Sequence, residues 1–205
     1  MATVTEAWIR IEGWLHQHTP RSGARLAGPA TSDLIMATEV QTGVAFPAEL
    51  VESLLRHDGL IEQANLFPEA KPLAVKEISE QYEIRMDIAP DVDGFTVHAP
   101  SAEPWWHELW LPFGDAGYGL QVIDMRPGPR CGRLGMAATS NPADFSDGWP
   151  SLSAYLTAIA DALEQGGTVG KWHPYVVEDE TLWWDLAGRT EVNGEPLRPA
   201  PSTGS

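Results

Sequence analysis

The residues whose types could perform chemistry in this sequence are few, and two short runs hold most of them. His57-Asp58 places a base next to a carboxylate, as acid–base catalysis requires. Asp91-Val-Asp93-Gly94 resembles part of a calcium loop, or the Asp-x-Asp pair of sugar transferases. However, His57-Asp58 precedes Gly59 at a predicted helix end, which favours capping or turn formation. The Asp91 run lacks the third acidic ligand and final Glu of an EF-hand, which favours a turn.

The other reactive side chains also lack the neighbours that catalysis needs. His16 and His18 lie two positions apart on a predicted helix, so they do not share a face for a metal ion. Cys131 is the single cysteine, which excludes an intrachain disulfide. Arg130 and Arg133 would favour its thiolate, but no histidine is near it in sequence. The sequence has no phosphate-binding loop and no nucleophile elbow. We therefore predict a non-enzymatic protein without metal or cofactor, and a hydrolase that uses His57-Asp58 or the two aspartates is a third alternative.

Aromatic and acidic residues are the better candidates for binding a partner. Tryptophans occur in two adjacent pairs, at 105–106 and 183–184, and neighbouring strand residues point to opposite sides of a sheet. One tryptophan of each pair would then face away from the core, where it is either covered or offered to a partner. An acidic run and a hairpin turn supply further contacts. The predicted partner-binding residues are Trp106, Asp115, Tyr118, Glu178, Asp179, Glu180 and Trp184.

Charge and hydropathy limit the class of partner. The 205 residues include 29 acidic and 13 basic side chains, for a formal net charge of −16. Direct nucleic-acid binding needs a basic surface, so this composition disfavours it. A basic protein partner fits instead. The N-terminal residues do not have the layout of a signal peptide. No apolar run approaches the roughly 18 residues of a membrane span, and we expect a cytoplasmic protein.

The periodicity of apolar residues predicts which elements position these side chains. Helical spacing and end signals occur in five segments, and alternation between turn residues predicts strands in five more. Helices are expected at 5–18, 31–41, 47–59, 73–89 and 150–165, and strands at 108–113, 118–125, 131–137, 175–177 and 182–186. The three consecutive strands indicate an antiparallel meander. We predict a single α+β domain over residues 1–197, with a core over about 31–163 and a disordered tail at 198–205.

The order of several motifs resembles the SUKH superfamily of Smi/Knr-type cell-wall regulators and bacterial toxin immunity proteins. The resemblance is carried by 34–59, with Phe46-Pro47 before an apolar helix and His57-Asp58-Gly59 after it. It continues through Trp110-Leu-Pro-Phe-Gly-Asp115, Tyr118-Gly-Leu-Gln-Val-Ile-Asp124, Gly132 and a late helix at 152–163. Such a resemblance implies an α+β fold with a central, mainly antiparallel sheet flanked by helices. It also implies a non-enzymatic role, and it supplies no catalytic set.

Our leading hypothesis from this resemblance is an immunity protein that binds a cognate polymorphic toxin, for example a nuclease. An acidic surface with exposed aromatic side chains would cover the basic active site of the toxin. The alternative is a regulatory or scaffold module of the Smi/Knr type that has no toxin partner.

Overall fold

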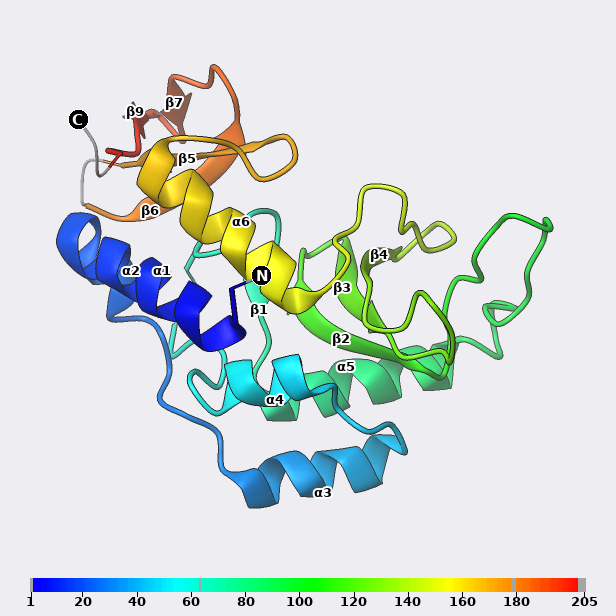
Figure 1. The fold of residues 1–205 in the computed structure, drawn as a ribbon. Helices are drawn as coiled ribbons and strands as arrows, with labels where there is room; N and C mark the ends of the chain where they lie inside the picture. The colour runs from blue at the N-terminus through cyan, green and yellow to red at the C-terminus, as the bar shows by residue number, and fades with distance from the viewer. Residues whose placement is uncertain (1, 63, 178–179, 203–205) are drawn as a thin grey trace.

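A four-stranded antiparallel sheet forms the centre of the protein, in a computed structural model that describes residues 2–62, 64–177 and 180–202. Its strands follow the order β1 (Lys71–Pro72), β2 (Trp110–Asp115), β3 (Gly119–Asp124) and β4 (Leu134–Ala138). The predicted meander is thus confirmed. The short β1 was not predicted, and it extends the sheet by pairing with the end of β2. Figure 1 shows the sheet with helices around it, so the α+β prediction is confirmed.

The five predicted helices are all present. They are α1 (Val4–His18), α3 (Ser32–Thr42), α4 (Ala48–Leu54), α5 (Val75–Ile88) and α6 (Leu152–Gln165), and a single turn, α2 (Pro20–Gly23), follows α1. Hydroxyl side chains of Thr3, Thr31 and Ser151 accept backbone N–H bonds at the starts of α1, α3 and α6. Left-handed Gly43 and Gly166 end α3 and α6. Helix α4 is shorter than predicted, because it ends at Leu54 rather than at Gly59.

Helices α1 and α6 pack together and join distant parts of the chain. The guanidinium of Arg10 in α1 forms ion pairs with Asp161 and Glu164 in α6. The indole N–H of Trp14, also in α1, donates to the carbonyl of Pro201 at 3.1 Å. The apolar face of α1 is buried under these contacts, including Trp8, Ile11, Trp14 and Leu15. The N-terminal helix is therefore part of the core, together with the C-terminal segment.

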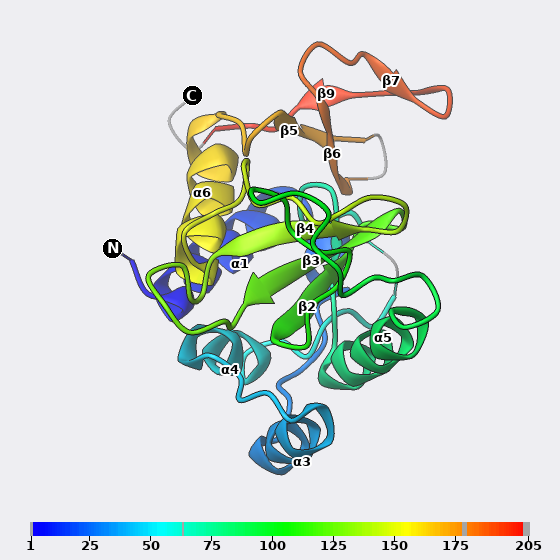
Figure 2. The same ribbon diagram turned by 90° about the vertical axis from the view of Figure 1, so that its right-hand side faces the viewer.

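A second, smaller sheet lies near the top of both views, whereas helix α5 lies toward the bottom (Figures 1 and 2). It has the order β6 (Leu182–Leu186), β5 (Trp172–Val176), β9 (Arg198–Pro199), and β7 (Glu191–Val192) pairs separately with β8 (Glu195–Pro196). The prediction of a disordered tail from residue 198 was wrong. Strand β9 pairs with β5, and Ala200 is buried. Residues 203–205 lie outside the described residues.

The tryptophans predicted to anchor a partner are instead core residues. Trp106 is fully buried and meets the Trp110 ring edge-on, with ring centroids 6.0 Å apart. Trp184 is 2% exposed, and its indole N–H donates to the Leu66 carbonyl at 3.1 Å. The Trp106 indole N–H has no hydrogen-bond partner among the described residues, but both rings are enclosed by the core and offer no surface to a partner. The prediction was therefore wrong for both Trp106 and Trp184.

Candidate functional site

The conspicuous His57-Asp58-Gly59 motif forms a junction between four segments, which we call the His57–Gly59 junction. The two ring nitrogens of His57 lie 2.7 Å from the Ala27 carbonyl oxygen and 2.8 Å from a carboxylate oxygen of Glu12. The carboxylate of Asp58 accepts the N–H of Val75 at 2.7 Å, at the start of α5. Asp58 therefore does not touch the His57 ring, and the two residues do not form an acid–base pair.

The remaining groups of the junction are also paired within the chain. The Arg56 guanidinium donates to Glu12, with 2.7 Å between Nη2 and Oε2. Gly59 has a φ of +71°, and a Cβ there would lie 2.7 Å from the Ala74 nitrogen. The adjacent cavity, lined in part by Trp8, Ser53 and His57, has a volume of about 20 Å³. This space suits about one water molecule and no substrate, so the junction has a structural role.

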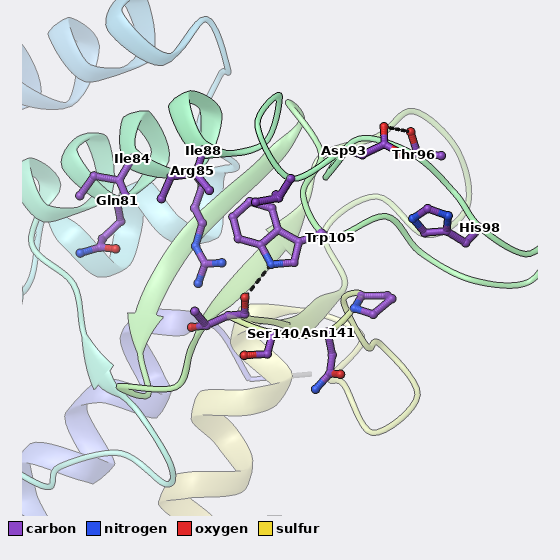
Figure 3. Close-up of a pocket in the computed structure, with 13 residues that line it drawn as sticks. Gln81, Ile84, Arg85, Ile88, Asp93, Thr96, His98, Trp105, Ser140 and Asn141 are labelled. Atoms are coloured by element: carbon purple, nitrogen blue, oxygen red, sulfur yellow. Dashed lines mark hydrogen bonds between the residues drawn. The ribbon is translucent and has the colours of Figure 1, made fainter.

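The candidate site is a cleft of about 470 Å³ beside helix α5, which we call the α5 cleft. Three segments form it: one face of α5, the loop between α5 and β2, and the residues after β4 (Figure 3). Its lining residues are Gln81, Ile84, Arg85, Ile88, Val92, Asp93, Thr96, His98, Trp105, Thr139, Ser140, Asn141 and Pro142. Ile84 and Arg85 lie three and four positions after Gln81 and four and three before Ile88, so the four residues share one side of the helix.

Arg85 is the unusual residue of the α5 cleft, because it is 6% exposed and yet carries a charge. Its guanidinium lies over the Trp105 ring, 4.7 Å from the centroid. It also donates to the carbonyls of Ala137 and Ala138, each at 3.4 Å. These bonds are longer than the 2.7–3.2 Å of a strong N–H···O bond. Burial lowers the pKa of Arg85, and the charge of Asp115 opposes that change without outweighing it.

The loop wall of the cleft depends on a close approach of backbone and indole. A Cβ on Gly94 would lie 2.7 Å from a carbon of the Trp105 ring, so only glycine leaves room for this ring. The Trp105 indole N–H then donates to the Thr139 carbonyl at 2.9 Å, which links the loop to the end of β4. This bond fixes the Trp105 ring, which lies under the Arg85 guanidinium and closes one side of the cleft.

A group of four charged residues holds the C-terminal end of the same loop, and we call it the Asp124 quartet: Glu103, Asp124, Arg126 and Arg133. Each arginine contacts both carboxylates, at distances between 2.6 and 3.0 Å. Burial raises the pKa of Asp124, but hydrogen bonds from the two arginines outweigh it and leave the pKa below its ordinary value. Every charge here has an opposite partner, in contrast to Arg85.

Two of the predicted partner-binding residues lie near the cleft, and others do not. The Asp115 carboxylate accepts the Gly117 N–H at 2.8 Å inside the β2–β3 turn. Tyr118 follows it and is 52% exposed; its hydroxyl donates to Glu69, and its carbonyl accepts from Thr139 of the cleft. Glu180 is exposed beside the smaller sheet, whereas Glu178 and Asp179 lie outside the described residues. Asp115 and Tyr118 thus lie beside the cleft, whereas Glu180 lies elsewhere. A partner-binding role for these three residues stays a prediction.

The residues considered for metal or nucleophilic chemistry do not form a site in the described part of the chain. No three His, Cys, Asp or Glu side chains there gather to hold a metal ion. Asp93 accepts the Thr96 hydroxyl at 2.6 Å in a turn, as the turn interpretation predicts. Cys131 is exposed. Among the described residues, no helix is long and apolar enough to cross a membrane.

Sequence reasoning missed Arg85, although a signal for it exists. The buried residues of α5 are Val75, Ile78, Ser79, Tyr82 and Arg85. Arg85 occupies a buried position between the buried residues Tyr82 and Ala89. An arginine in the buried stripe of an amphipathic helix is a polar exception in the core, and such exceptions indicate a functional or pairing role.

Comparison with known proteins adds a family match to this geometry. Residues 29–158 match the SMI1 / KNR4 family (SUKH-1). A KNR4/SMI1 homolog of Kluyveromyces lactis is 26% identical over 126 residues, and the match covers 50% of this chain and 24% of that protein. A KNR4/SMI1 homolog of Eremothecium gossypii is 40% identical over 53 residues, 26% of this chain and 8% of that protein. The chain therefore matches less than a quarter of the length of these relatives.

Proposed function

Because the chain belongs to the SMI1 / KNR4 family (SUKH-1), we propose that it is a non-catalytic protein-interaction module and that it binds its partner at the α5 cleft. The family match covers all of α5, the loop after it and the residues after β4, so the cleft lies within the matched region. A partner-binding role requires an accessible, shaped surface, and no converging catalytic groups.

The observation that carries this proposal is the gathering of exposed apolar side chains at the cleft. Ile84 is 48% exposed, Ile88 41% and Val92 54%, and all three line it. Phe95 and Val97 in the same loop are 43% and 50% exposed. Apolar side chains that are grouped around a concave surface and edged by polar residues are typical of a protein–protein interface.

Within this role, we propose a cognate toxin as the partner, with the chain as its immunity protein. The net charge of −16 supports this proposal, since it would attract a basic toxin domain. Asp115 and Tyr118, at the hairpin beside the cleft, would extend the contact. The complex should then weaken as salt concentration rises. An affinity that does not respond to salt would exclude electrostatic steering.

The names of the relatives favour a second candidate, a regulatory interaction module without a toxin. Both relatives are KNR4/SMI1 homologs from fungi. Co-expression separates the two candidates. An immunity protein restores the growth of cells that produce its toxin, whereas a regulatory module captures regulatory or biosynthetic proteins and protects against none.

The test of the cleft starts with capture of partners from the producing organism by the tagged chain and their identification by mass spectrometry. The purified partner is then titrated calorimetrically against the double variant Ile84→Gln/Ile88→Gln. Both isoleucines would be buried at the interface, so their loss should cost about 2 kcal/mol, or about thirtyfold in Kd.

Ile9→Gln is the matched control. Ile9 is 54% exposed on helix α1, and it does not line the cleft. Its replacement should leave Kd within about threefold of the unaltered chain. Equal losses for Ile9→Gln and the cleft variant, or none for either, would exclude the α5 cleft as the binding surface.

A further inference from the structure

We propose that the α5 cleft accepts an acidic side chain, Asp or Glu, flanked by apolar residues in a segment of the partner protein, and that this carboxylate pairs with Arg85. This inference rests on the proposed function and adds the chemistry of the segment that enters the cleft. It follows from the charge, burial and surroundings of Arg85.

The first step is that Arg85 lacks an opposite charge within the chain. In the described part of the protein it forms no ion pair, and its polar contacts are the two 3.4 Å bonds to Ala137 and Ala138. The single carboxylate among the lining residues, Asp93, lies at the far end of the cleft and accepts from Thr96 (Figure 3). Asp115 acts on Arg85 from a distance while its own oxygen is bound in the turn.

The second step is that burial without a partner charge is costly, and an incoming carboxylate would relieve that cost. A guanidinium has five N–H donors arranged as a planar fork, which matches the two oxygens of a carboxylate. Such charge-assisted, bidentate bonds are stronger than neutral ones. Arg85 is also held in place by Trp105, so little side-chain freedom is lost when the bond forms.

The third step is that the surroundings favour a carboxylate over a phosphate group. A phosphate carries close to two negative charges and is usually held by several cations or N–H donors. Arg85 is the single Lys or Arg among the residues that line the cleft. The chain as a whole carries −16, which opposes any anion but opposes a dianion more than a single carboxylate. One carboxylate balances one guanidinium.

The fourth step concerns what surrounds the acidic residue. Ile84 and Ile88 lie on the same side of α5 as Arg85, and Val92 and Pro142 add apolar surface on the other walls. Apolar neighbours of the acidic residue would cover these side chains and exclude water from the ion pair. Gln81, Ser140 and Asn141 remain available to bond the backbone of the segment. A short acidic–apolar segment therefore fits the α5 wall of the cleft and the residues after β4, with Asp93 at the other end of the cleft.

Short random peptides are displayed as N-terminal fusions, so that no free carboxy terminus is offered, and are selected for binding to the full chain. We expect the selected peptides to share one Asp or Glu next to apolar residues. Their synthetic forms, capped at both ends, should lose affinity on the order of tenfold to a hundredfold when that residue becomes Asn or Gln. Arg85→Met should cause a similar loss, and the two changes together should cost little more than either alone.

Arg130→Met is the matched control, because Arg130 is exposed and outside the cleft while the change in net charge is the same. It should leave peptide affinity unchanged. Circular dichroism and the melting temperature check that Arg85→Met folds. Arg85→Lys keeps the charge without the fork, and it should recover only part of the affinity.

Four outcomes would overturn the inference: selection of no binding peptide, selected peptides without an acidic residue, equal binding by Arg85→Met, and stronger binding of a free carboxy terminus or of inorganic phosphate. Failure here is distinct from failure of the proposed function. A partner whose binding depends on Ile84 and Ile88 but not on Arg85 supports the interaction cleft and excludes the acidic anchor.

Discussion

The His57–Gly59 junction and the α5 cleft both hold an arginine against the protein, but only the junction gives that arginine a carboxylate. The hydrogen bond that Arg56 donates to Glu12 raises the pKa of Arg56, whereas burial lowers the pKa of Arg85. The junction forms a prominent motif in the sequence, and its charged side chains are paired within the chain. The cleft forms no such motif, and its buried arginine has only two long hydrogen bonds among the described residues. A motif rich in polar residues can thus serve the fold, whereas the isolated charge of Arg85 lies in the candidate site.

The largest expected effect is on the junction, at Gly59. In Gly59→Ala the new Cβ would meet the backbone of Ala74 at 2.7 Å, and φ is +71°. We expect a loss of about 3 kcal/mol in the free energy of unfolding, measured by urea denaturation. Gly43→Ala is the matched control, because Gly43 has a φ of +70° and nothing within 4 Å of its Cβ position. It should lose about 1 kcal/mol, and equal losses would show that the contact with Ala74 is unimportant.

A smaller effect is expected at Asp58, which joins the junction to α5. Asp58→Ala removes the acceptor for the Val75 N–H at the first turn of the helix. We expect a loss of about 1.5 kcal/mol in the free energy of unfolding. Asp91→Ala, an exposed aspartate in the loop after α5, should change it by less than about 0.5 kcal/mol. Equal losses in the free energy of unfolding for the two variants would contradict the role of Asp58 at the start of α5.

The junction should also respond to acid in a way that the cleft does not. Burial raises the pKa of Glu12, but bonds from Arg56 and His57 outweigh it and lower the pKa from 4.5. A lowered folded-state pKa stabilises the protein above the unfolded-state value and loses that effect as pH falls through the folded value. Glu12→Gln should therefore cost about 1 kcal/mol near neutral pH and nothing in strong acid. The effect of Arg85→Met on stability should change much less over this range, since a guanidinium keeps its proton and Arg85 has no carboxylate bonded to it among the described residues. Parallel pH curves for the two variants would contradict this distinction.

The smallest expected effect is that of cleft residues on stability. Ile84→Gln and Ile88→Gln replace half-exposed side chains, so each should change the free energy of unfolding by less than about 0.5 kcal/mol. Thermal and urea unfolding would measure it beside the binding assays. A loss of 2 kcal/mol or more would mean that these residues support the fold, as the junction does.

Local signals were sufficient to predict the long helices and the meander. Thr31 and Gly43 mark both ends of α3, and Ser151 and Gly166 mark those of α6. The turn residues between β2 and β3 likewise predicted the hairpin. These elements could be predicted because their determinants lie within a few residues of one another.

Features that depend on distant residues could not be predicted in this way. Strand β1 exists because Lys71 pairs with Asp115, and β9 because Arg198 pairs with Val176. The role of Gly59 depends on Ala74, and the burial of Trp184 depends on Leu66. The candidate site is of the same kind. Arg85 becomes notable only when Trp105 and the end of β4 are placed around it.

The packing of α1 against α6 and the C-terminal segment also has a consequence for synthesis of the chain. Arg10 and Glu164 are 154 residues apart in sequence, and Trp14 and Pro201 are 187 apart. Translation at about 5–20 residues per second leaves the apolar face of α1 without these contacts for on the order of ten seconds. Closing so long a loop slows folding. We therefore expect α1, which is synthesised well before α6 and the segment around Pro201, to reach its native packing late and to need protection by chaperones on the ribosome.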